Sequence, residues 1–328
     1  MPNLLPTSYF PVLLFASSFI HGFAAPVQSK LLPLIPREAQ IMAGVEDPRN
    51  PDTRGHLLLV TAKNTFDFDD WQSLTGVDTH RLVDETVWVA ASSPASQLNE
   101  HMLLVAGLFD REHIFAAAER NGAAAGAYRG VDVLAVKPFA REAAQMPDTR
   151  WLAILDGQSA VFGTPWLVQK ALDRYVDHAP ADRLVADRIG RLNPKVNSWD
   201  LILTPHAAFA KHAAPALPSA PWIDLLGREL LENAEELTLG IRYGTTARID
   251  FMVRTAGDRN PSPGLAARPM LDSSSLPASS PAAAPRLENI SEAPNLTVGT
   301  IALPGKELYA CFKFASCGES ATALRTAQ

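Results

Sequence analysis

The sequence feature that most constrains the fold is a period of two between residues 237 and 254. Apart from Met252, apolar side chains alternate there with polar or small ones on two arms, which Gly244, Thr245 and Thr246 separate. The apolar positions are Leu237, Leu239, Ile241 and Tyr243 on the first arm and Ile249, Phe251 and Val253 on the second. Such a period gives each strand one buried face and one polar face. The pattern therefore predicts a β-hairpin within a mainly antiparallel sheet.

The stretch from Arg37 to Pro221 alternates short apolar runs with amphipathic segments, which is typical of mixed α and β structure. Asp110 is the expected N-cap of a helix over residues 111–121, and Gly122 is its expected end. Asp156-Gly157 is expected to form a hairpin turn. The predicted strands are Glu85–Ala90, Met102–Phe109, Tyr128–Val136, Trp151–Leu155, Ser159–Phe162 and Ser198–Thr204.

Two further helices are predicted, from Pro165 to Val176 and from Asp182 to Leu192, each with an apolar stripe at helical spacing. The resulting order is strand, helix, strand, strand, helix, strand, which matches a ferredoxin-like split βαβ unit. HLLLV at His56–Val60 resembles HMLLV at His101–Val105, so the domain could also consist of two pseudo-repeats that share a sheet. The expected fold class is α+β.

The N-terminus has the pattern of an export signal. Its first 25 residues contain no Lys, Arg, Asp or Glu, and Tyr9–Ile20 is an apolar run shorter than a membrane span. Gly22 and Ala24 give a small-x-small site for cleavage before Ala25, so residues 1–24 are predicted to be a signal peptide. Because no positively charged residue precedes the run, an uncleaved anchor and a buried N-terminal element stay as alternatives. After cleavage no stable membrane span is expected.

The remaining chain divides by composition. Residues 31–256 are predicted to form the α+β domain, and residues 257–295, rich in Pro, Ser and Ala, a linker. Residues 296–328 are predicted to add a short strand, Leu296–Leu303, and a helix, Gly305–Ala315, which either dock on the main sheet or stay loose. A net charge of -6 on 328 residues gives no general attraction for nucleic acid, which is excluded as a partner.

Residues with catalytic or metal-binding potential do not form a recognised pattern. His206 and His212 are six residues apart, and no HExxH motif occurs. Gly157-Gln158-Ser159 lacks the second glycine of a serine-nucleophile motif, so Ser159 is interpreted as an exposed turn serine. His101 and His113 are given structural roles.

The acidic segment at Asp67, Asp69 and Asp70 lacks the glycine and glutamate of a calcium-binding loop, because Ser73 and Thr79 stand at those positions. Cys311 and Cys317 are too few for a disulfide scaffold or a four-cysteine metal site, and whether they pair stays open. We therefore predict no catalytic, cofactor-binding or metal-binding residue and no cofactor.

One succession of segments resembles a known group. LLVAGLFDREHI, YRGVDVLAV and WLAILDGQSAVFGTPWLVQKALD are similar to segments of exported bacterial proteins known only as a domain of unknown function, over roughly residues 33 to 255. The Pro/Ser-rich segment and the short C-terminus differ from that pattern. The resemblance implies an exported α+β protein and carries over no catalytic residue.

The function expected from these observations is binding or scaffolding, without catalysis, by an exported bacterial envelope protein that is periplasmic or extracellular. Its partner would be an unidentified envelope protein or a small ligand. Two alternatives stay open: a secreted hydrolase whose site is assembled from residues distant in sequence, and a carrier of an apolar ligand.

Overall fold

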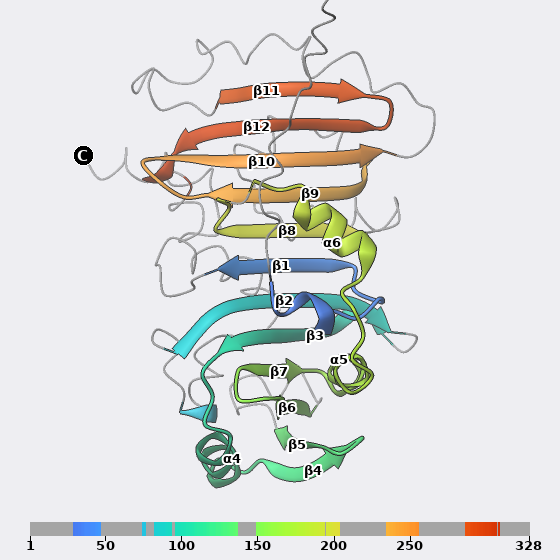
Figure 1. The fold of residues 1–328 in the computed structure, drawn as a ribbon, viewed down its shortest axis with the longest axis vertical. Coiled ribbons are helices and arrows are strands. Elements are labelled where there is room, and N and C mark those ends of the chain that lie inside the picture. The colour runs from blue at the N-terminus through green and yellow to red at the C-terminus, as the bar shows by residue number, and fades with distance from the viewer. Residues whose placement is uncertain are drawn as a thin grey trace, which may run out of the picture.

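One continuous sheet organises the protein (Figure 1). The computed structural model describes residues 29–46, 74–76, 82–93, 96–136, 149–193, 195–203, 234–255, 286–306 and 308. Twelve strands lie in the order β11-β12-β10-β9-β8-β1-β2-β3-β7-β6-β5-β4. They are β1 (Ile41–Glu46), β2 (Val83–Ser93), β3 (Ser96–Gly107), β4 (Ala124–Tyr128), β5 (Val131–Val136), β6 (Arg150–Ile154), β7 (Ser159–Gly163), β8 (Ser198–Leu203), β9 (Ala234–Arg242), β10 (Thr246–Thr255), β11 (Arg286–Ala293) and β12 (Leu296–Pro304).

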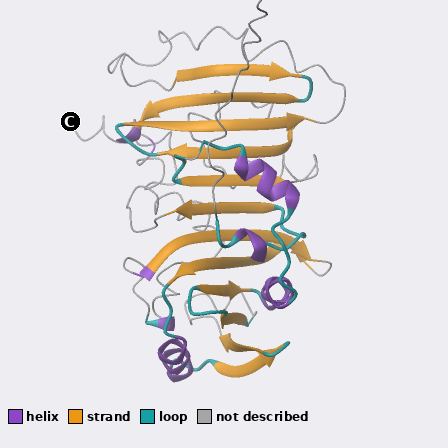
Figure 2. Ribbon diagram, viewed as in Figure 1, coloured by secondary structure: helices purple, strands orange, loops and turns teal. Residues whose placement is uncertain are grey.

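Few helices accompany the sheet (Figure 2). The helices whose bounds the structure gives are the 3-10 helix η1 (Leu32–Leu34) and the α-helices α4 (Arg111–Arg120), α5 (Pro165–Val176) and α6 (Arg183–Gly190). Asp110, the expected N-cap of α4, accepts from the His113 amide at 3.0 Å. Asp182, expected as the first residue of the last helix, is instead its N-cap and accepts from the Leu184 amide at 2.9 Å. Leu184, expected in the buried stripe of α6, is 43% exposed. The sequence thus located each of these α-helices.

All pairings between the described strands are antiparallel, which confirms a sheet-dominated α+β fold. The ferredoxin-like unit is not confirmed. In such a unit one strand separates the two strands that a helix connects, whereas three strands lie between β3 and β4, which flank α4. Three strands also lie between β7 and β8, which flank α5 and α6. The proposed repeat at His56–Val60 falls outside the described residues.

The structure corrects two sequence-based boundaries. Tyr128–Val136 was expected as one strand, but Arg129 and Gly130 have φ of +48° and +83° and turn the chain between β4 and β5. Such paired positive φ values are typical of a two-residue hairpin turn. The predicted linker reached Asn295, yet β11 occupies Arg286–Ala293 and pairs with β12, as β12 pairs with β10. β11 has little apolar surface of its own, and its backbone hydrogen bonds to β12 stabilise it instead.

Helices cover the two faces of the sheet differently. We call the face under η1, α5 and α6 face 1, and the face under α4 face 2. Alternate residues of β1, β2 and β3 supply the two faces: Met42, Val89 and Leu104 belong to the face-1 core, and Val45, Trp88 and Leu103 belong to the face-2 core. A third apolar cluster combines the predicted hairpin positions of β9 and β10 with Ile301 and Leu303 of β12 and Ile202 of β8.

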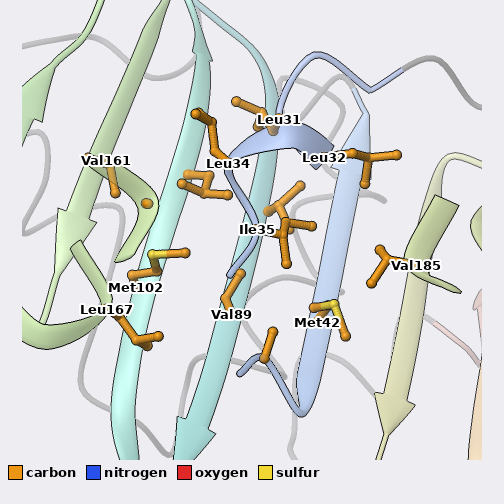
Figure 3. Close-up of a cluster of buried hydrophobic side chains, with 14 of the residues drawn as sticks. Leu31, Leu32, Leu34, Ile35, Met42, Val89, Met102, Val161, Leu167 and Val185 are labelled. Atoms are coloured by element: carbon orange, nitrogen blue, oxygen red, sulfur yellow. The ribbon is translucent and has the colours of Figure 1, made fainter. Parts of the chain in front are cut away.

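The N-terminal segment belongs to the face-1 core. Leu31 and Ile35 are completely buried, and Leu32 and Leu34 are nearly so. Figure 3 shows these side chains gathered over the strands with Met42, Val89 and Met102, which belong to the same apolar cluster. Arg174 of α5 donates to the Pro33 carbonyl oxygen at 2.7 Å and so holds the segment from the helix side. The segment just after the predicted cleavage site is therefore part of the core.

β1 and β8 meet at a contact that leaves no room for an added side chain. Gly44 lies directly opposite Trp199, whose side chain is 1% exposed. A Cβ atom at Gly44 would lie 2.1 Å from the Trp199 Cε2 atom, well inside van der Waals contact. Trp199 is also opposite Gly240 of β9. The indole therefore needs the absence of a side chain at Gly44.

We expect Gly44→Ala to lower the free energy of unfolding by about 1–3 kcal/mol, because the added methyl group forces the buried indole to move. Urea unfolding measures this change. Gly126→Ala on β4 is the matched control, since its Cβ would meet the nearest Val133 atom at an ordinary 3.7 Å. Equal destabilisation of both variants would contradict the role given to the Trp199 contact.

Candidate functional site

β4 forms one end of the sheet, and its outer side has no partner among the described strands. The four residues Ala124–Ala127 are exposed, small and uncharged, and Tyr128 is half-buried. Tyr128 and Val131 flank the two-residue turn, so Tyr128, Gly126 and Ala124 direct their backbone groups toward β5. Ala125 and Ala127 consequently direct their N–H and C=O groups outward. We call the outer side of Ala124–Tyr128 the β4 edge.

The opposite end of the sheet has a different edge. β11 carries Arg286, Glu288 and Glu292, and Glu288 lies 3.8 Å from Arg248 of the same face. The register between β11 and β12 shifts between Glu288 and Ser291, where Asn289 has a φ of +51°. Charged side chains and bulges are the usual means of preventing an edge strand from pairing. β11 has both features, whereas the β4 edge has neither.

The hairpin that carries the β4 edge is attached to α5. Arg129, in the turn, donates to Asp173 at 3.0 Å and to Asp177 at 2.7 Å. Tyr128 donates its hydroxyl to Asp173 at 3.1 Å. The hydrogen bond from Arg129 holds the pKa of the Asp177 carboxyl below its ordinary value. Exposed ion pairs add little stability, so this one mainly fixes where the hairpin lies and where the Arg129 charge points.

α5 is itself held on the sheet, so the attachment is firm. Tyr175 donates its hydroxyl to the Leu155 carbonyl oxygen at 3.1 Å, at the end of β6. On face 2, Arg111 of α4 forms an ion pair with Asp132 of β5. The β4–β5 hairpin is thus connected to a helix on each face. These contacts set the position of the hairpin that carries the β4 edge.

A second chemical feature lies beneath the N-terminal segment on face 1. Glu46 of β1 and Glu85 of β2 are direct cross-strand partners. Burial raises the pKa of Glu85 to about 7, opposed by hydrogen bonds from the Ser29 side chain and the Lys30 backbone. Burial also raises the pKa of Glu46. We call Glu46 and Glu85 the carboxyl pair.

Most residues considered for chemistry in the sequence lie outside the described residues. They are Asp67, Asp69, Asp70, His206, His212, Cys311 and Cys317. Within the described part of the chain, no group of three His, Cys, Asp or Glu residues could hold a metal ion. None of the described helices is long and apolar enough to cross a membrane.

Ser159, expected as an exposed turn serine, is 8% exposed and begins β7. The turn precedes it, where Asp156 accepts from the Gln158 and Ser159 amides at 2.9 and 2.8 Å. Its pairing with Ala106 of β3 draws Ser159 into the sheet. His101 is buried on β3, beside the start of α5, where the Thr164 amide donates to its carbonyl oxygen at 2.9 Å.

Sequence reasoning missed the Arg129 attachment and the β4 edge. The available signal was Arg129-Gly130 between two runs of strand-forming residues, which is a turn pattern. The prediction of one strand over Tyr128–Val136 overlooked this turn, because apolar residues follow Gly130 directly. The partners Asp173 and Asp177 are 44 and 48 residues away, so no local pattern could identify them.

Comparison with known proteins identifies one distant structural match. No family model matches the chain, and no curated protein is similar to it in sequence. One solved structure that resembles the fold is crystal form I of TP0453, at 10% identity and a TM-score of 0.49. The match covers 88% of this chain and 98% of that one.

The carboxyl pair predicts how stability depends on pH. Glu85 keeps its proton in the folded chain up to about pH 7, whereas the ordinary value is 4.5. Between these values the unfolded chain binds fewer protons, so the free energy of unfolding falls as pH rises through this window. The fall should be on the order of 2–3 kcal/mol.

We expect Glu85→Gln to abolish most of this fall, because the amide has no proton to lose. Urea unfolding at about pH 5 and about pH 8 brackets the window in which the two states differ in bound protons. Glu112→Gln, on the exposed surface of α4, is the control for the change in net charge. An unchanged slope in Glu85→Gln would show that Glu85 is not the group responsible.

Proposed function

We propose that this chain is an exported protein of the bacterial cell envelope that acts by binding another polypeptide, without catalysis of its own. The β4 edge is the proposed binding surface. The observation that carries the proposal is the contrast between the two ends of the sheet. β11 is charged and interrupted by a bulge, whereas the β4 edge is uncharged, exposed and attached to helices on both faces.

Strand addition is the binding mode that fits this surface. An added strand would receive the outward N–H and C=O groups of Ala125 and Ala127, and each such hydrogen bond contributes about 0.5–1.5 kcal/mol net. On face 1 the added strand would lie beside Tyr128, whose ring is 6.1 Å from that of Trp151. Backbone bonds would supply affinity, and this aromatic pair would favour one register.

Export is supported by the N-terminal pattern together with the core. Cleavage before Ala25 would remove the apolar run at Tyr9–Ile20. It would leave Leu31–Ile35, which fills the face-1 core. Cleavage at that site would therefore keep these core residues in the mature chain.

The export proposal predicts a mature N-terminus near Ala25 in protein from the native host. Mass spectrometry of N-terminal peptides, after fractionation of cytoplasm and envelope, measures it. Ala24→Leu is the informative variant, because a bulky residue at the cleavage site should slow processing and leave the longer chain. An intact Met1 on cytoplasmic wild-type protein would contradict export.

The binding proposal predicts that charges on the β4 edge remove partners. Ala125→Lys with Ala127→Lys should lower the amount of polypeptide recovered with the tagged chain after cross-linking in the native envelope, because lysine on an edge opposes pairing. Quantitative mass spectrometry measures the recovery. Ser291→Lys with Ala293→Lys adds the same charge to exposed positions of β11 and should recover what the wild type recovers. Equal recovery by both double variants would refute the β4 edge as the surface.

A further inference from the structure

We propose that the polypeptide bound by the β4 edge is β4 of a second copy of this chain, paired antiparallel about a two-fold axis at Gly126. This inference rests on the proposed function, because it names the partner of the same edge. The two sheets would join into one. The argument uses the hydrogen-bond pattern of the strand, the side chains along it and the position of its nearest charge.

The hydrogen-bond pattern of β4 is symmetric about its centre. Ala125 and Ala127 direct their backbone groups outward, and Gly126 lies midway between them. In an antiparallel pair centred on Gly126, Ala125 of each copy faces Ala127 of the other. Each of these pairs exchanges both of its N–H···O=C bonds. Every outward backbone group of these two alanines would therefore be used.

The side chains along β4 also fit this arrangement. The two Gly126 residues would form a non-hydrogen-bonded pair, in which Cα atoms approach to about 4.5 Å, and glycine places no side chain there. Ala124 of each copy would lie opposite Tyr128 of the other, so a small side chain faces a large one. The two tyrosine rings would lie on face 1, continuous with the core around Val131 and Trp151.

The charge nearest to the strand is directed away from the edge. Arg129 follows Tyr128 directly, and two arginines near one axis would repel each other. Its guanidinium instead contacts Asp173 and Asp177 of its own α5. The attachment of the hairpin thus also leaves the edge free of uncompensated charge, which a symmetric pairing requires.

The small side chains favour a second copy over an unrelated partner. Recognition of a foreign strand needs pockets that accept its alternate side chains, and Ala124–Ala127 provide only methyl groups and a glycine. A pairing of five residues per copy buries less accessible surface than a stable interface, which buries about 1,200 Å² or more. We therefore expect a weak, concentration-dependent dimer that a covalent bond at the axis can trap.

Gly126→Cys tests the axis directly, in a chain that also carries Cys311→Ser and Cys317→Ser. A Cβ at this position meets only Val133, at 3.7 and 3.9 Å, so the variant should fold. A Cα separation of about 4.5 Å lies within the range that a disulfide bridges. Mild oxidation of the purified chain should give a covalent dimer, measured by non-reducing electrophoresis and mass spectrometry.

Ala124→Cys in the same background is the matched control. Its two cysteines would be about four residue steps, or about 14 Å, apart along the paired strands, too far for a disulfide. We expect the Gly126→Cys chain to form its dimer at least about tenfold faster, because the pairing raises the local concentration of the two thiols. Adding Ala125→Lys and Ala127→Lys to Gly126→Cys should remove this advantage.

Equal rates for Gly126→Cys and Ala124→Cys would overturn the two-fold pairing. Loss of recovered envelope polypeptides in the Ala125→Lys, Ala127→Lys variant would then still support the β4 edge as a surface for a different chain. If neither the disulfide nor the recovery depends on the β4 edge, the proposed function falls as well. Circular dichroism of each variant separates loss of pairing from loss of folding.

Discussion

The sheet depends on the contact between Trp199 and Gly44. β1 has only six residues, yet it joins the strands on the β2 side to those on the β8 side. The indole of Trp199 fills the space above Gly44 and lies next to the α6 side of the sheet, where Gly240 approaches Leu192 and Val196. A side chain at Gly44 would separate β1 from β8 or displace the indole. The close pairing of β1 with β8 therefore requires glycine at position 44, because any other residue would place a Cβ atom against the indole.

Local signals predicted the elements whose cause is local. The cap at Asp110, the turn at Asp156-Gly157 and the alternation along β9 and β10 all act within a few residues, and each predicted element forms. β11 was missed because its stability comes from pairing with β12 rather than from its own composition. The strand order was also out of reach, because β1 pairs with β8 across more than 150 residues of sequence.

The candidate site was hidden for the same physical reason. The residues of β4, AAGAY, match no functional motif. They form an edge because β4 is the last strand in the order, and that order is set only when the whole sheet assembles. The carboxyl pair is similar. Glu46 and Glu85 are ordinary acidic residues in sequence, and only the pairing of β1 with β2 places them opposite each other. Local sequence patterns predict individual strands and helices, whereas pairing between strands distant in sequence determines which of their residues come into contact.

The asymmetry between the two edges also decides what kind of assembly the sheet permits. Pairing of β4 with β11 of another copy would be head-to-tail, would leave a free edge at each end and would continue into a filament. The bulge at Asn289 and the charges of β11 oppose that contact. Pairing of β4 with β4 is self-complementary and closes after two copies, with only the protected β11 edges at the two ends. Pairing through β4 therefore permits a dimer and opposes further addition of copies to the sheet.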